Sequence, residues 1–274
     1  MKIFQAYYKE EQQAHLDPEF TPYDNTANPV VNLHEYYIYT KIFQEALKTN
    51  EDLWGHFSWQ WKRKMPGVPA AFIMDHININ PGYDVYTFHP FPHETVTHWN
   101  VWEQGQWCHP EILKLAERIF ADMDIDPKRL QAPMGTRHYL CANYFVGNGK
   151  FWAGMMGMLH QFVDVCGRLP DEYLDLLNSS AGYGDNQKLD YRGFICERLI
   201  SSFLLMHEDR LKIRPFRELY DARLGPDQRK ILAAKDCAID ARSRDFLYDY
   251  LALRPPVPEG KTDWGKDWAM TCVL

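Results

Sequence analysis

Short apolar runs alternate with longer segments in which apolar residues recur every three or four positions. The apolar runs predict strands at residues 3–8, 53–59, 70–74, 83–88 and 139–146. The helical spacing predicts helices after Asn32, after Pro110 and over 150–166, 171–178, 193–206 and 227–253. This alternation is typical of the α/β class, and we expect one domain with a mostly parallel central sheet flanked by helices.

Two loops are the first candidates for function. In open parallel sheets, ligands bind beyond the carboxyl ends of the strands, which favours residues 9–29 and 59–69. The glycine-rich stretch 181–187 is a candidate active-site lid. The proline-rich residues from 255 onward predict an extended tail, so we expect a domain over 1–254 and a tail over 255–274.

Asn32 is the expected N-cap of the first helix, because Glu35 follows three residues later. This is a variant of the capping box, in which each side chain accepts a hydrogen bond from the backbone N–H of the other residue.

Composition narrows the class of protein. Of the 274 residues, 46% are apolar and 24% are charged, which is typical of a soluble globular chain. Thirty Lys and Arg against 37 Asp and Glu give a net charge of −7, so we expect no nucleic-acid partner. Six scattered cysteines without a C-x-x-C pair predict neither a disulfide framework nor a zinc ribbon.

No apolar run approaches the ~20 residues that a membrane span needs, and the N-terminus turns polar at once. We therefore expect no transmembrane segment and a cytoplasmic protein, compatible with peripheral contact at the inner face of a membrane.

Two patterns resemble cofactor sites without matching them. Gly147-x-Gly149 follows a predicted strand, but Trp152 stands where a dinucleotide fingerprint needs its third glycine. His89, His93 and His98 cluster near Glu94, but prolines interrupt the helical spacing that zinc-binding histidines use. A structural role for these histidines is favoured over a metal-dependent hydrolase.

The basic run Lys62-Arg63-Lys64 follows the second predicted strand, where cations can neutralise a diphosphate leaving group. A solvated basic turn explains the run equally well. Glu197 is a candidate general base, although the same carboxylate can simply pair with Arg198.

Asp185 and Asp190, on or beside the glycine-rich stretch, are rivals of Glu197 for the catalytic role. The two D-x-D strings within 122–126 follow a predicted helix instead of a strand, so we expect no D-x-D metal site.

Five segments together resemble a known family. They are Asp24-Asn25-Thr26 with Asn32-x-x-Glu35-Tyr36, Leu53 to Trp59, Asp84-Val85 with Thr95-Val96 and His109, Met134-Gly135 with Tyr139-Leu140-Cys141-x-Asn143-x-Phe145, and Gly193 to Leu199. The family comprises bacterial capsule and exopolysaccharide-biosynthesis proteins, a domain of unknown function related to GT-A glycosyltransferases. Its H-Y-R-R motif stands here as Ser58-Trp59-Gln60-Trp61, with the basic residues displaced to 62–64.

The resemblance implies a GT-A-like (Rossmann-like) domain and a hexosyltransferase that acts in capsule, exopolysaccharide or lipopolysaccharide synthesis. The implied donor is a nucleotide-sugar, a UDP-sugar first, and the acceptor is a saccharide or a lipid-linked saccharide. No cofactor is firmly implied, with Mn²⁺ or Mg²⁺ as the candidates. The alternative is a catalytically silent GT-A relative that binds a sugar or a partner protein.

The resemblance also implies site residues. Glu197 would be the base, with Asp185 and Asp190 as its rivals. The donor-binding residues would be Tyr7, Tyr8, Asp24, Asn25, His56, Ser58, Lys62, Arg63, Lys64 and Asn143.

Overall fold

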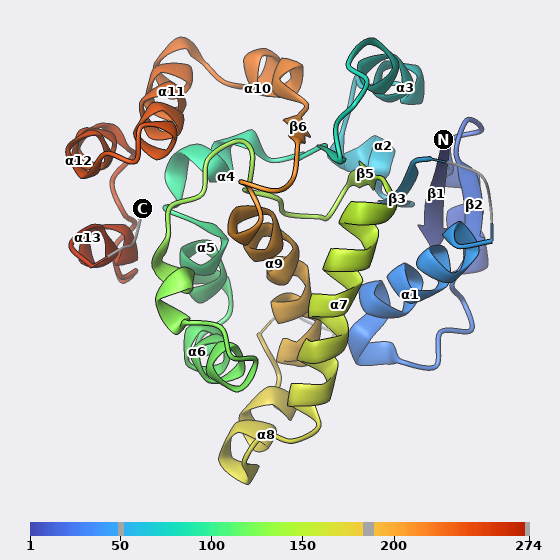
Figure 1. Cartoon of the computed structure of the whole chain (residues 1–274), viewed down its shortest axis with the longest axis horizontal. Coiled ribbons are helices and arrows are strands. Elements are labelled where there is room, and N and C mark those ends of the chain that lie inside the picture. The colour runs from blue at the N-terminus through green and yellow to red at the C-terminus, as the bar shows by residue number, and fades with distance from the viewer. Residues whose placement is uncertain (49–51, 183–188, 272–274) are drawn as a thin grey trace.

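The computed structural model describes residues 1–48, 52–182 and 189–271 (Figure 1). A six-stranded sheet has the order β2-β1-β3-β5-β4-β6. Its strands are β1 (Lys2–Tyr7), β2 (Thr21–Asp24), β3 (Trp54–Ser58), β4 (Val85–Thr87), β5 (Phe145–Gly147) and β6 (Ile213–Pro215). Only the pairings of β5 with β3 and β4 are antiparallel. The expected α/β class with a mostly parallel sheet is confirmed, although the sheet is mixed.

Helices make up most of the remaining structure. They are α1 (His34–Ala46), α2 (Trp61–Lys64), α3 (Ala70–Ile79), α4 (Pro92–Thr97), α5 (Val101–Cys108), α6 (Ile112–Asp122), α7 (Gly149–Cys166), α8 (Asp171–Asn178), α9 (Tyr191–Met206), α10 (Arg217–Arg223), α11 (Pro226–Asp240), α12 (Arg244–Leu253) and α13 (Trp264–Ala269). Three short 3₁₀ helices span Glu10–His15, Val31–Leu33 and Pro127–Gln131. Among the described residues no helix is long and apolar enough to cross a bilayer.

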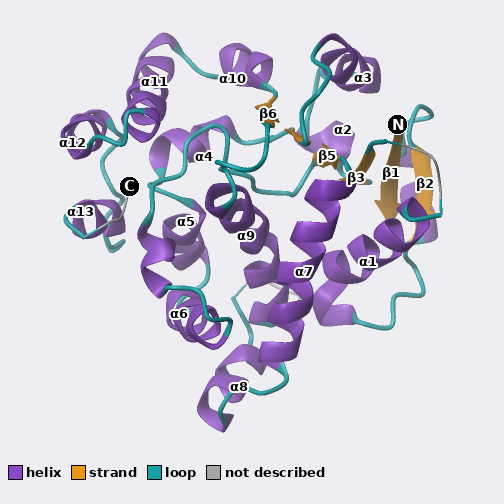
Figure 2. Cartoon of the chain, in the orientation of Figure 1, coloured by secondary structure: helices purple, strands orange, loops and turns teal. Residues whose placement is uncertain are grey.

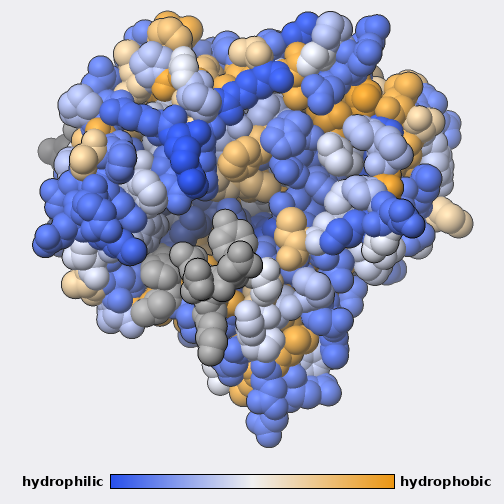
Figure 3. Space-filling view, turned by 180° about the vertical axis from the view of Figure 1, so that it is seen from behind, coloured by the Kyte–Doolittle hydropathy of each residue, from blue (hydrophilic) through white to orange (hydrophobic). Residues whose placement is uncertain are grey.

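The two faces of the sheet belong to two separate apolar cores. Successive side chains of a strand point to opposite faces, so Phe4 packs in one core and Ile3 in the other. Helices α1, α7 and α9 cover the Phe4 face, while α2, α3 and α10 supply the core on the Ile3 face. Figure 2 shows the strands as a short orange band with helices on both sides. Seen from behind, the molecule is hollowed near the centre of its face, and hydrophilic side chains border much of the hollow (Figure 3).

Residues 70–74 form the start of helix α3, so the predicted strand there is wrong. Ala70, Ile73 and Ile77 are buried at intervals of three and four, which is the spacing of one helix face. A run of apolar residues this short does not distinguish a buried strand from the start of a helix.

Four other expectations need correction. The 9–29 segment contains β2, the strand predicted over 139–146 pairs only at its end as β5, and the tail beyond 255 contains α13. The single helix expected over 227–253 is two helices, because the chain turns between them at Arg242, whose φ is 50°. Ser243 then caps α12 by accepting a hydrogen bond from the Phe246 N–H.

The capping box at the first helix is also wrong. Helix α1 begins at His34 with Leu33 as its N-cap, and no side chain caps it. Glu35 instead turns its carboxylate toward Tyr39 and Asn143.

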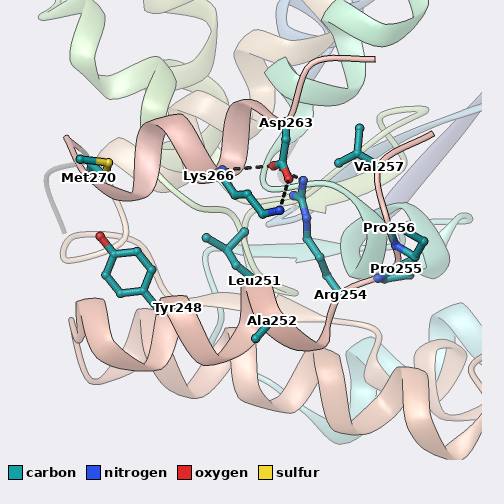
Figure 4. Close-up of a pocket in the computed structure, with 10 residues that line it drawn as sticks. All are labelled: Tyr248, Leu251, Ala252, Arg254, Pro255, Pro256, Val257, Asp263, Lys266 and Met270. Atoms are coloured by element: carbon teal, nitrogen blue, oxygen red, sulfur yellow. Dashed lines mark hydrogen bonds and ion pairs between the residues drawn. The ribbon is translucent and has the colours of Figure 1, made fainter. Parts of the chain in front are cut away.

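The C-terminal helices border an open, mostly apolar pocket of about 670 Å³ between α12, α13 and residues 255–257 (Figure 4). At its edge the Arg254 guanidinium pairs with Asp263, and Lys266 lies 3.4 Å from the same carboxylate. Arg254 also binds the fully buried Glu103 of α5 at 3.1 Å. Glu103 accepts further hydrogen bonds from the Trp99 and Gly265 N–H groups, at 2.6 and 2.8 Å. One carboxylate thus ties α5 to both C-terminal helices.

Replacing Arg254 should destabilise the protein strongly. Because Arg254→Ala leaves the buried Glu103 without its cation, we expect the free energy of unfolding to fall by about 3–5 kcal/mol in urea denaturation. The control is Arg118→Ala, which removes an ion pair with Asp122 on the surface of α6 and should lose only about 0.5 kcal/mol. Equal losses in the two variants would contradict this account.

Candidate functional site

Two adjoining cavities open beyond the carboxyl end of β3, as expected for this type of sheet. The larger, of about 690 Å³, is lined by Arg63, Lys64, Arg198 and Arg223 among others, and we call it the cationic cavity. The smaller, of about 210 Å³, is lined by Glu35, Asp190 and Glu197 among others, and we call it the carboxylate cavity. Lys64, Phe194 and Glu197 line both, so these three side chains mark the junction.

Three segments far apart in the sequence supply the junction. β3 ends at Ser58 and the chain continues into α2, which carries Lys64. α9 presents Glu197, while the irregular segment 139–144 passes between α9 and β3. The Ser58 hydroxyl lies 2.8 Å from the Tyr144 hydroxyl, which fixes this segment to the end of the strand.

The segment 139–144 holds two carboxylates in place. The Ala142 N–H donates to Glu197 Oε1 at 2.8 Å. The next residue, Asn143, donates through Nδ2 to Glu35 Oε2 at 2.8 Å. The Tyr39 hydroxyl donates to the same Glu35 oxygen at 3.0 Å. Consecutive residues therefore position one carboxylate from α1 and one from α9.

The backbone at these two residues is strained. Ala142 has φ of 72° and Asn143 has φ of 43°, both in the left-handed region. Asparagine tolerates this region, whereas alanine adopts it rarely. Such conformations cost on the order of 1–3 kcal/mol each and persist only where the surroundings fix them. Here the two carboxylates and the Ser58–Tyr144 contact do so.

Glu197 influences the protonation of Glu35. Burial first, and then the negative charge of Glu197, raise the pKa of Glu35 to about 7. Hydrogen bonds from Asn143 and Tyr39 and the charge of Lys64 act in the opposite direction. Tyr8, which follows β1, has its pKa raised by burial and by the charge of Glu35. Near neutral pH Glu35 can therefore gain or lose a proton, and a second carboxylate, Glu197, lies in the same site.

The four cations of the cationic cavity are not equivalent. Arg198 donates to the carbonyls of Val101 and Phe194 and to Gln104. Arg223 donates to the carbonyls of Lys64, Pro66 and Pro90. Both guanidinium groups thus hold the protein together.

Arg63 and Lys64 remain for an anion. Arg63 is exposed and bonds only the Gln60 side chain among the described residues. The Lys64 ammonium lies 6.0 Å from the centre of the Phe91 ring and 5.9 Å from that of Tyr144. Within the described ranges it makes no hydrogen bond or ion pair. Lys64 is therefore the cation best placed at the junction.

The predicted residues are distributed unevenly around the cavities. Glu197, Arg63, Lys64 and Asp190 line them, and Asn143 binds Glu35. Asp190, however, caps α9 through the Arg192 N–H and pairs with the Arg192 side chain. Asp185 lies outside the described residues.

Lys62 points away from the cavities. Its ammonium donates to the Leu16 carbonyl at 3.2 Å and lies 3.9 Å from Asp17. His56 is buried in the middle of β3, where its ring contacts Tyr39 edge-on.

Tyr7, Asp24 and Asn25 form a separate cluster at the ends of β1 and β2. Tyr7 and Asp24 are register partners, and the Asn25 N–H donates to the Tyr7 carbonyl at 2.9 Å. None of the three lines either cavity, and their donor-binding role stays a prediction.

Sequence reasoning missed the part that Glu35 plays in this site. Its spacing from Asn32 suggested a helix cap. The one sequence signal that grouped it with Asn143 and Glu197 was that all three lie in segments that resemble the polysaccharide-biosynthesis family.

His93 and Glu94 line the cationic cavity as well. His89 instead is buried, and its Nδ1 lies 3.2 Å from the Cys141 N–H. Among the described residues no three His, Cys, Asp or Glu side chains form a group that could hold a metal ion.

Glu35→Gln should change how stability depends on pH. Because the folded state binds the Glu35 proton more tightly than the unfolded state does, this contribution is fully present below about pH 4.5 and is lost as pH rises through about 7. The wild-type protein should therefore lose up to about 3 kcal/mol relative to Glu35→Gln between pH 4.5 and 7.5 in urea denaturation. Glu172→Gln, on the exposed face of α8, is the control. Parallel curves for wild type and Glu35→Gln would contradict the raised pKa.

Comparisons of the chain with models of protein families, with curated proteins and with solved structures give no match. The site therefore has to be interpreted from its own residues and geometry.

Proposed function

We propose that the protein is a glycosyltransferase with a GT-A-like domain, which moves a hexose from a nucleotide-sugar to a saccharide acceptor. The observation that carries the proposal is the pair Glu35 and Glu197 at the junction of a cationic cavity and a smaller carboxylate cavity. The resemblance of five segments to polysaccharide-biosynthesis proteins adds the biological setting. We place the reaction in bacterial surface-polysaccharide assembly in the cytoplasm, with a UDP-sugar as the first candidate donor.

The sizes of the cavities favour a division between the substrates. At ~30 Å³ per water molecule, the carboxylate cavity has room for about seven waters, comparable with one monosaccharide unit. The cationic cavity is about three times larger and presents Arg63 and Lys64 to an anion. We assign the nucleoside diphosphate to the cationic cavity and the acceptor sugar to the carboxylate cavity, so that the transferred sugar lies at their junction.

The reaction follows from this arrangement. The acceptor hydroxyl oxygen forms a bond to the anomeric carbon, and the bond from that carbon to the diphosphate oxygen breaks. The electron pair leaves with the diphosphate, whose charge Arg63 and Lys64 neutralise. Glu197 takes the hydroxyl proton as general base. Glu35, with its raised pKa, donates a hydrogen bond to a sugar hydroxyl when it is protonated.

Within residues 1–48, 52–182 and 189–271, no group of three His, Cys, Asp or Glu side chains could hold a metal ion. We derive no step of the reaction through Mn²⁺ or Mg²⁺.

Lys64→Ala should weaken the binding of nucleoside diphosphates, whereas Lys62→Ala should not. Of these two lysines only Lys64 lines the cavities, because the Lys62 ammonium contacts Leu16 and Asp17 instead. In thermal-shift titrations with UDP, GDP, CMP and dTDP, one nucleotide should raise the melting temperature of wild type and Lys62→Ala alike. Lys64→Ala should need about tenfold more of that nucleotide, the effect of one charge-assisted contact.

Two results would contradict this assignment. If Lys64→Ala binds as tightly as wild type, the diphosphate does not lie in the cationic cavity. If no nucleotide stabilises the wild-type protein, a sugar-binding or partner-binding protein explains the structure better than a transferase does.

Glu197→Gln should abolish turnover while leaving donor binding intact. The amide oxygen can still accept from the Ala142 N–H, so the segment 139–144 keeps its position. We expect kcat to fall about 10²- to 10⁴-fold with KM for the nucleotide-sugar nearly unchanged. Release of the nucleoside diphosphate is the measurement, with Glu172→Gln as the control. Turnover equal to wild type would remove Glu197 from the mechanism.

A further inference from the structure

One member of the histidine cluster faces the cationic cavity. His93, on α4, lines this cavity and its side chain is 58% exposed. Its Nε2 lies 3.4 Å from Glu94 Oε1, so an imidazole open to the cavity rests on a carboxylate. The sequence pattern had singled out this histidine, and the reaction described above does not use it.

The carboxylate of Glu94, which lies next to His93, is held in place by a second histidine, His98. His98 is buried, and its Nε2 lies 2.8 Å from the second oxygen of Glu94. The buried Lys235 of α11 donates to the His98 carbonyl at 2.6 Å, which fixes the end of α4. Burial raises the pKa of Glu94, but the bonds from His93 and His98 outweigh it and leave the pKa well below its usual range. Glu94 is therefore ionised, and its negative charge lies 3.4 Å from the His93 ring nitrogen.

His93 also lies close to the cation at the junction. Both contact the Phe91 ring, because the His93 ring centre is 6.2 Å and the Lys64 ammonium 6.0 Å from the centre of that ring. The two side chains therefore border the same aromatic wall of the cationic cavity.

The other charged and titratable groups around His93 come from several elements. They include Arg63 and Lys64 of α2, Cys108 of α5, His109 directly after α5, Cys141, Glu197 and Arg198 of α9, Arg223 of α10 and Lys235 of α11. Arg198, Arg223 and Lys235 donate to protein carbonyls. The His109 ring is buried and its Nδ1 lies 2.9 Å from the Ala181 carbonyl, whereas His93 is exposed to the cavity.

We propose that His93 binds the diphosphate of the donor as an imidazolium, with Glu94 and His98 as positioning residues. The inference rests on the proposed function for the identity of the anion, but the binding of phosphate groups stands on the geometry alone. Because the anion favours the protonated ring, binding takes up a proton, and the His93 contribution disappears when the ring is neutral.

Inorganic pyrophosphate tests this assignment without knowledge of the base or the sugar. Its dissociation constant is measured calorimetrically at pH 6.0 and pH 8.0 for wild type, His93→Gln, His93→Lys and the control His160→Gln, which changes an exposed histidine of α7. Pyrophosphate itself gains charge over this range, so the variants are compared with wild type at each pH.

We expect His93→Gln to bind about tenfold more weakly than wild type at pH 6.0 and nearly equally at pH 8.0. His93→Lys should bind more tightly than wild type at pH 8.0, because its cation does not depend on pH. His160→Gln should match wild type at both values. Circular dichroism checks that each variant is folded.

Two results would overturn the inference: equal affinities of wild type and His93→Gln at pH 6.0, or no binding of pyrophosphate to wild type. A measurement of nucleotide-sugar turnover distinguishes failure of this inference from failure of the proposed function. If pyrophosphate binding depends on His93 but no nucleotide-sugar is consumed, the proposed function fails and the anion site stands. If a nucleotide-sugar is consumed and His93→Gln binds pyrophosphate normally, the inference alone fails.

Discussion

The site depends on the contact between two consecutive residues and two carboxylates. Ala142 and Asn143 leave the usual backbone regions so that one N–H and one side-chain amide reach Glu197 and Glu35. Two carboxylates brought together in a half-buried site repel each other unless donors or protons compensate. The turn supplies the hydrogen-bond donors, and because its pKa is raised, Glu35 can keep a proton near neutral pH. A strained turn therefore permits an arrangement of charge that neither helix would form alone.

The two cores explain why this turn can exist. On one face of the sheet Phe145 packs with α1, α7 and α9, and on the other Tyr144 packs with Phe57 and Trp61. The segment 139–144 before β5 thus packs against an apolar core on each side, which leaves its backbone little freedom to relax. Arg223 adds a restraint from α10 by donating to three carbonyls around α2 and before α4. The backbone of Lys64 is consequently held from α10.

Much of this fold follows from local sequence pattern. β1, β3, β4, α7 and α8 lie where the spacing of apolar residues predicts them. The failures have physical causes. Residues 139–144 are nearly all buried between the two cores without pairing as a strand. The break at Arg242 interrupts an otherwise continuous amphipathic pattern. In the site, residue type and neighbourhood pointed to Glu197, Arg63 and Lys64. The partnership of Glu35 with Asn143 spans 108 positions, and local spacing carries no information about it.

The buried Glu103 has a consequence for how the chain folds as it is made. Its cation, Arg254, follows 151 residues later, and the Gly265 N–H that completes its hydrogen bonds comes later still. At the ~5–20 residues per second of protein synthesis, this carboxylate waits roughly 8–30 s for its partner. During that interval α5 cannot bury the charge without a large penalty, so the region around it stays open to solvent. The N-terminal half of the sheet can form on the ribosome, whereas the layer of α5, α12 and α13 closes only after α12 and α13 emerge.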